Sequence, residues 1–324
     1  MRKFSSVQVS IAAISAIIAV LSCSSNIELP PSYDGSSSST VPSSSSVMPS
    51  SSSVLPSSSS TVPSSSSVAP SSSSIEPSSS SSSSAAIGEG LCEGFVEGTP
   101  REHYGQSKSQ FCDERDGKRY VYVTIGTQTW MAENLNLIVE ESKCYGEDGE
   151  IVIGRENNIN ITGPSLPPEE VQTNCETYGR LYNWNMAMNN SASSNNNPSG
   201  VQGVCPAGWH LPSNAEWDVL ADYAGGASSG AGTKLKATSG WNDHETYGNG
   251  TDDYGFSGLP GGNFSASYSG YFADVKTRGQ FWSSRQDNNV NAIRRDLYYG
   301  SGNANQFGSS KTSLHSVRCV KNEP

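Results

Sequence analysis

Aromatic and acidic side chains are concentrated between Trp241 and Phe272, in a stretch that is also rich in glycine and asparagine. Flat apolar rings can stack on the faces of sugars, and nearby amide and carboxylate oxygens can accept hydrogen bonds from sugar hydroxyls. The composition therefore predicts a carbohydrate-binding loop. We expect the contacts to come mainly from three tyrosines, with one tryptophan as a candidate for either the binding surface or the core: Tyr247, Tyr268, Tyr271 and Trp241.

The same loop offers oxygen ligands for a hard cation. Asp243, Asp252 and Asp253 carry carboxylates of the kind that Ca²⁺ prefers. A calcium site on these residues is a second hypothesis for the loop, and the alternative is that the three carboxylates are solvated. We expect no other cofactor.

The sequence contains no familiar catalytic pattern. The four histidines are scattered, and none has a sequence neighbour that suggests a catalytic triad. A phosphate-binding loop and the HExxH motif are also missing. These observations favour a non-catalytic protein; the alternative is an enzyme with an unrecognised active site in the glycine-rich loops.

The seven cysteines divide into Cys23 and six that follow it. An even number of cysteines in an exported domain most often forms disulfides, and the sequence alone leaves several pairings open. A zinc site is not indicated, because no two cysteines lie within a CxxC spacing and none pairs with a nearby histidine in a zinc-ligand pattern. We expect three disulfides.

The residues around the loop predict short strands. Residues 111–125 read as a hairpin with Asp116-Gly117 at its turn, and residues 128–131 as the next strand. Residues 144–175 are polar and contain three prolines, so we expect a long loop there. Residues 178–188 are rich in large apolar side chains and predict a strand, or a strand leading into a helix. Further strands are expected at residues 280–284, 292–299 and 316–320.

The clearest helix is expected at residues 214–224. Ser213 can cap its N-terminus and Glu216 can return the contact, while Gly225 and Gly226 end it. Its apolar residues share one face and are expected to pack on a sheet: Trp217, Leu220, Ala221 and Ala224. After residue 225 the mixture of glycine, asparagine and aromatic residues is typical of long ordered loops.

Residues 1–23 have the layout of an export signal. Arg2 and Lys3 precede an apolar run at residues 7–21 that is too short to span a bilayer as a mature helix. The run ends in Leu21-Ser22-Cys23, which resembles a bacterial lipobox and implies that Cys23 is acylated and anchors the protein to a membrane. Ser24 resembles the residue found in lipoproteins sorted to the outer membrane. The alternatives are ordinary signal cleavage and an uncleaved membrane helix.

Residues 24–87 contain a serine-proline repeat. Proline recurs every seven residues from Pro42 to Pro77 and is followed each time by four serines. Proline in every heptad forbids a continuous helix, and the apolar residues are too few to form a core, which predicts a disordered stalk. The remaining head covers residues 88–324. The formal net charge of the chain, −11, argues against nucleic acid as a partner.

Six sequence blocks follow one another in the head: IGTQTWMAENLN from Ile125, YGRLYNW from Tyr178, CPAGWHLPSNAEWDVL from Cys205, YGFSGLPGG from Tyr254, FWSS from Phe281 and SVRCVK from Ser316. In this order they resemble the Fibrobacter succinogenes major paralogous domain. The GWHLPSNAEW block also resembles, more distantly, the C-type-lectin-like fold of formylglycine-generating enzymes. The resemblance implies an α+β domain with a small twisted antiparallel sheet, two helices and long ordered loops.

This resemblance also bears on the cysteines. Formylglycine-generating enzymes use a pair of active-site cysteines in the C-terminal region, but no cysteine lies between Cys205 and Cys319 in this chain. The pairs that fit the block order are Cys92–Cys112, Cys144–Cys175 and Cys205–Cys319, the last resembling the long-range disulfide of lectin-like folds.

Together these observations predict a lipoprotein of the bacterial cell envelope that displays a disulfide-braced head for binding or adhesion. Plant-type polysaccharide is the ligand class that the aromatic loop favours. The competing hypotheses are an enzyme and a structural envelope protein that binds other surface proteins.

Overall fold

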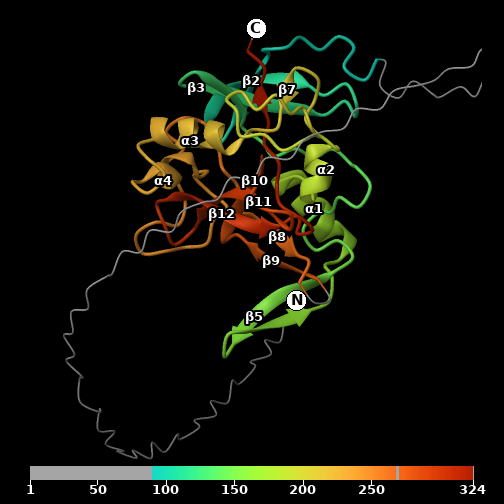
Figure 1. Ribbon diagram of the computed structural model, residues 1–324, viewed down its shortest axis with the longest axis vertical. Helices are drawn as coiled ribbons and strands as arrows, with labels where there is room; N and C mark the ends of the chain where they lie inside the picture. Colours follow the sequence, from blue (N-terminus) through green and yellow to red (C-terminus); the bar gives the residue numbers. More distant parts are fainter. Residues whose placement is uncertain (1–89, 268–269, 324) are drawn as a thin grey trace, which may run out of the picture. The chain divides into compact units, whose positions relative to one another are not determined.

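The computed structural model describes residues 90–267 and 270–323. The anchor with Cys23, the stalk at residues 24–87 and the candidate contact Tyr268 lie outside the described residues, so the hypotheses for them stay predictions. The described part of the head contains three sheets and four helices, and most of its regular structure is sheet (Figure 1). This composition agrees with the predicted α+β class.

The largest sheet has six strands, in the order in which they hydrogen-bond: β1 (Pro100–His103), β2 (Gln106–Cys112), β3 (Arg119–Ile125), β4 (Gln128–Met131), β13 (Val320–Lys321) and β7 (Trp209–His210). All of these pairs are antiparallel. The β2–β3 pair confirms the hairpin predicted at residues 111–125, and β4 confirms the strand at 128–131. The strand predicted at 316–320 is shorter than expected, because only Val320 belongs to β13 and Ser316 makes an isolated bridge to Phe281.

Two smaller sheets complete the fold. The first consists of β10 (Arg278–Gln286), β11 (Asn291–Tyr298) and β12 (Ala304–Ser310), and it confirms the strands predicted at residues 280–284 and 292–299. The second has the order β6 (Ile159–Gly163), β5 (Glu150–Glu156), β9 (Tyr271–Val275) and β8 (Gly261–Ser265). β5 and β9 pair in parallel. The sheet content is thus larger and more mixed than the single small antiparallel sheet expected from the resemblance.

The prediction of a long loop at residues 144–175 is wrong. This segment contains the β5–β6 hairpin and most of helix α1 (Pro168–Tyr178). Asn157 and Asn158 join the two strands with φ angles of 47° and 65°, which suits the type I′ turn of a two-residue hairpin. Pro168 stands at the start of α1, where the missing N–H costs no helical hydrogen bond. The prolines therefore lie between the elements and do not interrupt them.

Four helices are described where two were expected: α1, α2 (Trp184–Met188), α3 (Asn214–Tyr223) and α4 (Ala231–Leu235). The structure confirms the predicted capping box of α3. The Glu216 amide donates to Ser213 Oγ over 3.2 Å, and the Ser213 amide donates to Glu216 Oε2 over 2.9 Å. Trp217 on this helix is buried against Trp130, with the ring centroids 4.5 Å apart.

A separate apolar cluster supports the β6–β5–β9–β8 sheet. Its buried members are Tyr145, Leu181, Phe272 and Leu314. Phe272 points into this cluster from β9, with its ring 5.0 Å from that of Phe264 on β8. Because successive side chains of a strand point to opposite faces, the residues that flank Phe272 and Phe264 are turned away from the cluster.

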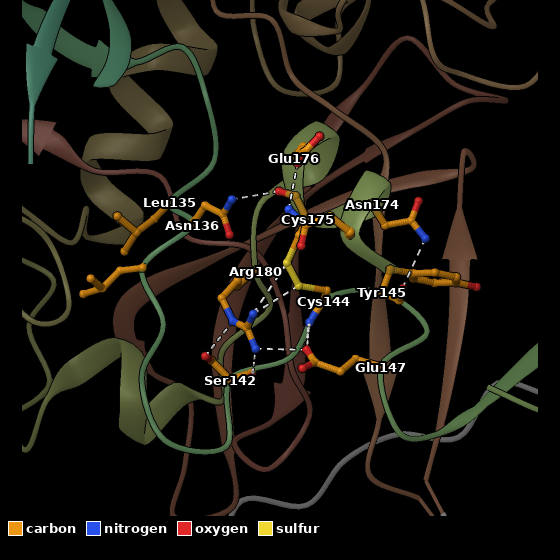
Figure 2. The surroundings of a disulfide bond; sticks show 12 residues. Leu135, Asn136, Ser142, Cys144, Tyr145, Glu147, Asn174, Cys175, Glu176 and Arg180 are labelled. Atoms are coloured by element: carbon orange, nitrogen blue, oxygen red, sulfur yellow. Dashed lines mark hydrogen bonds and ion pairs between the residues drawn. A yellow bond between two sulfur atoms is a disulfide. The ribbon is translucent and has the colours of Figure 1, made fainter. Parts of the chain in front are cut away.

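The six cysteines of the described residues form three disulfides: Cys92–Cys112, Cys144–Cys175 and Cys205–Cys319. These are the pairs expected from the order of the sequence blocks. The Arg180 guanidinium donates to both sulfurs of the Cys144–Cys175 bridge, over 3.2 and 3.5 Å, and to the Glu147 carboxylate over 2.9 Å (Figure 2). It also donates to Ser142 Oγ over 2.9 Å. Arg180 therefore joins the disulfide to the base of the β5–β6 hairpin.

Candidate functional site

A cavity of about 570 Å³ is lined by residues of β5, β6, β8, β9, β10 and β11. We call it the tyrosine groove, after the three tyrosines in its wall, Tyr271, Tyr298 and Tyr299. The rest of the lining is mostly polar: Val152, Arg155, Asn160, Asn263, Ser265, Ala273, Asp274, Thr277 and Arg278. The groove contains one of the predicted contact residues, Tyr271.

Strand alternation places the groove side chains of β8 and β9. On β9, Tyr271 and Ala273 line the groove while Phe272 between them is fully buried in the core. On β8, Asn263 and Ser265 line the groove while Phe264 packs on Phe272. Ser265 pairs with Tyr271 in the antiparallel register of these strands. The buried phenylalanines thus fix which side chains are presented to the groove.

The end of β11 supplies the other two rings. Tyr298 and Tyr299 have ring centroids 4.9 Å apart, and the Arg278 guanidinium lies 4.4 Å from the centre of the Tyr298 ring. Arg278 is held there by the buried Asp296, whose Oδ2 accepts from it over 2.9 Å. Burial, and then the hydrogen bond and charge of the neighbouring Tyr299, raise the pKa of Tyr298, whose neutral hydroxyl can donate or accept a hydrogen bond.

The predicted loop continues this aromatic surface beyond the groove. His244 packs edge-on against Tyr299 with ring centroids 5.7 Å apart, and the ring centroid of Tyr247 lies 5.5 Å from that of His244. The Gly248 amide donates to the Tyr299 carbonyl over 2.9 Å, which ties the loop to the end of β11. Tyr247 is 41% exposed. An aromatic strip therefore runs from Tyr247 through His244 to the tyrosines of the groove.

The polar groups of the groove can bind hydroxyls. Asn263 Oδ1 is buried and has no hydrogen-bond partner in the protein. A charged group and an amide are also close by, because Arg155 donates to Asn160 Oδ1 over 3.1 Å and both residues line the groove. Aromatic rings together with one unsatisfied amide oxygen suit a ligand that has apolar faces and hydroxyl edges.

Trp241 is not a contact residue, which corrects one of the sequence predictions. Only 5% of its surface is exposed, and its Nε1 donates to the Gly258 carbonyl over 3.1 Å. The Lys236 amine lies 5.2 Å from the ring centre. The Trp241 indole therefore packs in the core, which was the alternative to the binding surface in the sequence analysis.

The calcium hypothesis is also not supported by the arrangement of the aspartates. Asp252 is fully buried, and its two oxygens accept from the Ser257 amide and Ser257 Oγ, each over 2.6 Å. Asp243 and Asp253 are exposed. No group of three or more histidine, cysteine or acidic side chains within residues 90–267 and 270–323 is placed to hold a metal ion. Asp252 is therefore a structural residue that caps the turn at Ser257.

Sequence reasoning missed most of the groove. Tyr298 and Tyr299 stood at the end of a predicted strand, and only their position next to Gly300 signalled that they border a loop. Arg155 and Asn160 were hidden because their hairpin was assigned to a loop. The alternation of Ile159 and Ile161 with polar residues was the available signal for a strand.

The family model of the Fibrobacter succinogenes major domain matches residues 123–321. The chain belongs to this family. Every residue that lines the tyrosine groove of this family member falls inside the matched range. Neither a curated protein nor a solved structure matches the chain. In the part of this family member that the structure describes, no helix combines the length and hydrophobicity needed to cross a membrane.

Proposed function

We propose that the head binds polysaccharide of plant type through the tyrosine groove, without catalysing a reaction. The observation that carries this proposal is the gathering of three half-buried tyrosines and the unpartnered Asn263 oxygen in one cavity of about 570 Å³. A volume of this size is typical of a site for a small organic group, such as one or two sugar units.

The aromatic strip favours an extended ligand over a single sugar. Tyr247 is exposed at one end of the strip and is joined to Tyr299 through His244. Successive sugar units of a chain would then stack on successive rings, as expected for recognition of a polymer. The structural envelope protein that binds other proteins is the competing function, and it predicts no affinity for sugars.

The wider proposal is that this head is displayed on the cell envelope by a lipid on Cys23 and the stalk at residues 24–87. A C-type-lectin-like fold remains our proposal for the head. It is supported by the mixture of sheets and short helices and by the Cys205–Cys319 disulfide, which joins residues 114 positions apart.

Retention of the full chain on insoluble cellulose, xylan, mannan and pectin tests the function. We expect retention on at least one of these, elution by the matching soluble oligosaccharide, and loss of retention in the double variant Tyr247→Ala/Tyr271→Ala. Tyr223→Ala is the matched control, because Tyr223 is 55% exposed and lies outside the groove. Because no acidic cluster is placed to hold a metal among the residues that the structure describes, a chelator should not change retention. Failure of the wild-type chain to bind any of these polymers would reject the proposal in favour of a protein partner.

A further inference from the structure

A second cavity, of about 500 Å³, shares no lining residue with the tyrosine groove. It is formed by β1, the start of β3, the segment after β4 and the C-terminal end of α1. Three basic residues lie in its wall, and we call it the basic cleft after them: Arg101, Lys118 and Arg119. Glu133 and Glu176 are its acidic lining residues.

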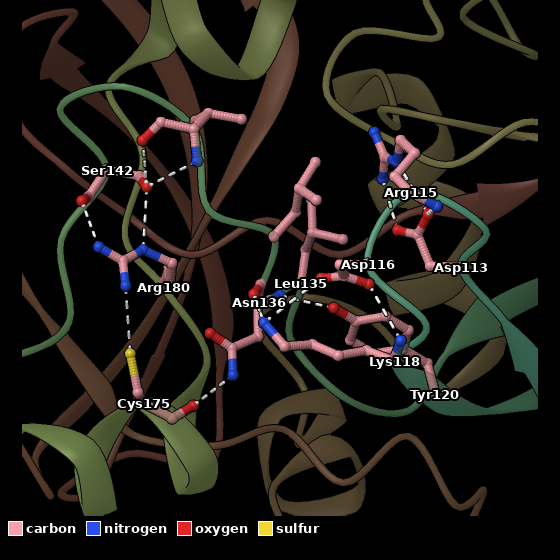
Figure 3. Close-up of polar contacts among 12 residues, drawn as sticks. Asp113, Arg115, Asp116, Lys118, Tyr120, Leu135, Asn136, Ser142, Cys175 and Arg180 are labelled. Carbon is pink, nitrogen blue, oxygen red and sulfur yellow. Dashed lines mark hydrogen bonds and ion pairs between the residues drawn. The ribbon is translucent and has the colours of Figure 1, made fainter. Parts of the chain in front are cut away.

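The wall is ordered by polar contacts, some of which are drawn in Figure 3. The Lys118 amine donates to the Asn136 carbonyl and forms an ion pair with Asp116 at 3.3 Å. The Asn136 amide donates to Tyr120 Oη over 3.0 Å. Arg101 pairs with Glu133. Unlike Lys118 and Arg101, Arg119 forms no ion pair with any residue that the structure describes. Its side chain is exposed, and its guanidinium lies 5.0 Å from the centre of the Phe95 ring.

Two further cations are buried behind the cleft. Arg318 is fully buried and bonds to neutral oxygens: it donates to Asn134 Oδ1 over 2.8 Å, to the Ser257 carbonyl over 2.6 Å and to the Phe256 carbonyl. Asn134 is itself a lining residue of the cleft. Lys108 is the second buried cation, and its amine lies 3.7 Å from the Asp252 carboxylate. The one buried carboxylate of this group, Asp252, thus faces two buried cations.

His103, another lining residue, lies near the same cations and 3.8 Å from the Glu133 carboxylate. Its pKa is lowered to about 3, first by burial and then by the charges of Lys108, Arg318 and Arg101. The imidazole is therefore neutral at physiological pH, and its position is one that disfavours a further proton. The charges of Lys108, Arg318 and Arg101 would attract an anion placed there, whereas the burial itself would oppose any charge. A buried guanidinium whose hydrogen-bond acceptors are all neutral is costly, so an anion in the cleft would also compensate Arg318.

We propose that the basic cleft binds a carboxylate group, presented either by an acidic saccharide or by a free organic acid. The carboxylate would accept hydrogen bonds from Arg119 and Arg101 at the rim, above the positive field of Arg318 and Lys108. This assignment is independent of the tyrosine groove, whose ligand is recognised by rings and amides. The head is acidic overall, and the basic cleft would thereby bind an anion on a surface that otherwise repels it.

Isothermal titration of the full chain with trigalacturonate tests the proposal. We expect saturable binding that weakens as salt is added, and that is weakened about tenfold or more in Arg101→Gln/Arg119→Gln. Glu133→Gln should strengthen binding, because it removes a negative charge from the wall while an amide oxygen can still accept from the Val121 amide. Arg285→Gln is the matched control, since Arg285 lines neither cavity.

Two further probes separate the sources of the carboxylate. A neutral galactose trisaccharide should not bind in the cleft, and acetate should compete with trigalacturonate only if a free acid is sufficient. Tyr271→Ala should leave trigalacturonate binding unchanged, so failure of the groove and failure of the cleft are distinguishable. The proposal would be overturned by absence of binding of both anions or by trigalacturonate binding that is indifferent to the two arginine substitutions. It would also be overturned if the neutral sugar bound as tightly as trigalacturonate and lost its binding to the same two substitutions.

Discussion

At the scale of single residues, burial separates the aromatic side chains that hold the fold from those that can meet a ligand. Trp217 and Trp241 are buried and bonded within the core, whereas Tyr247 is exposed and Tyr271 lines a cavity. The sequence assigned Trp217 to the packed face of its helix, but it grouped Trp241 with Tyr247 and Tyr271 as candidate contacts, because composition alone does not give the direction in which a side chain points.

We predict that Trp217→Ala lowers the free energy of unfolding by about 3–5 kcal/mol, the usual cost of removing a large buried ring. The indole packs against Trp130, Phe256 and Phe281 with centroid distances of 4.5–5.9 Å. Denaturant unfolding measures the change. Tyr223→Ala, on the exposed side of the same helix, should cost far less, and equal losses for the two variants would contradict the assignment.

The protonation of His210 makes the free energy of unfolding depend on pH, and the sign of this dependence follows from its contacts. Burial lowers its pKa, but the hydrogen bond and charge of Glu216, 2.6 Å away, outweigh this and the pKa is raised. The folded state therefore holds the proton more tightly than the unfolded chain. The resulting stability is fully present below the unfolded pKa of about 6.5 and is lost as the pH rises through the raised pKa.

The difference in unfolding free energy between the wild type and His210→Gln should therefore shrink as the pH rises from 6 to 9. His103 and His315, whose pKa values are lowered by burial, are unchanged in this variant and cancel in the difference. Urea unfolding at constant ionic strength provides the measurement. A difference that grows with pH would show that the sign is wrong.

At the scale of elements, the β5–β6 hairpin and the Cys144–Cys175 disulfide determine one side of the groove. β5 pairs in parallel with β9, which carries Tyr271, and Glu150 is the register partner of that tyrosine. The disulfide closes the chain around the hairpin, and Arg180 joins it to Glu147. The position of Tyr271 thus depends on a segment far away in the sequence.

We expect Cys144→Ala/Cys175→Ala to lower the free energy of unfolding by up to about 3–4 kcal/mol in the loop-entropy account, and also to weaken polysaccharide binding. The matched control is Cys92→Ala/Cys112→Ala, whose disulfide is far from the groove in the sequence and belongs to the β1–β4 region. This control should lose stability but retain binding. Equal loss of binding in both double variants would count against a local role of the hairpin.

The elements show what a sequence can predict here. The capping box at Ser213 and Glu216 and the β2–β3 hairpin were predictable because their signals lie within a few residues. The β5–β9 pairing was not, since parallel partners far apart in the chain leave no local signature. The hairpin at Asn157 and Asn158 could have been found from its turn residues, but the prolines that follow it concealed the pattern.

At the scale of the whole molecule, the two proposed binding sites lie in cavities with no lining residue in common. The tyrosine groove lies wholly within the region that matches the family, while Arg101, His103, Lys118 and Arg119 of the basic cleft precede it. The groove is therefore the feature to be sought in other members of the family. The basic cleft depends on the N-terminal part of this head.

The proposed anchor belongs to the same scale. We predict that mass spectrometry of the mature protein finds a lipid-modified Cys23 at the N-terminus, because the preceding residues resemble a lipobox. Cys23→Ala should release the head from the membrane fraction or block processing. An unmodified N-terminus beyond residue 23 would contradict the anchor without affecting the groove.

Stacking of sugar in the tyrosine groove can be measured by the affinity of the full chain for a soluble hexasaccharide of the retained polymer. Titration calorimetry should show that Tyr271→Ala weakens binding about fivefold or more, the equivalent of about 1 kcal/mol for one lost aromatic contact, while its melting temperature stays near that of the wild type. Tyr223→Ala should bind as the wild type does. Unchanged affinity in Tyr271→Ala, with the fold intact, would contradict the account.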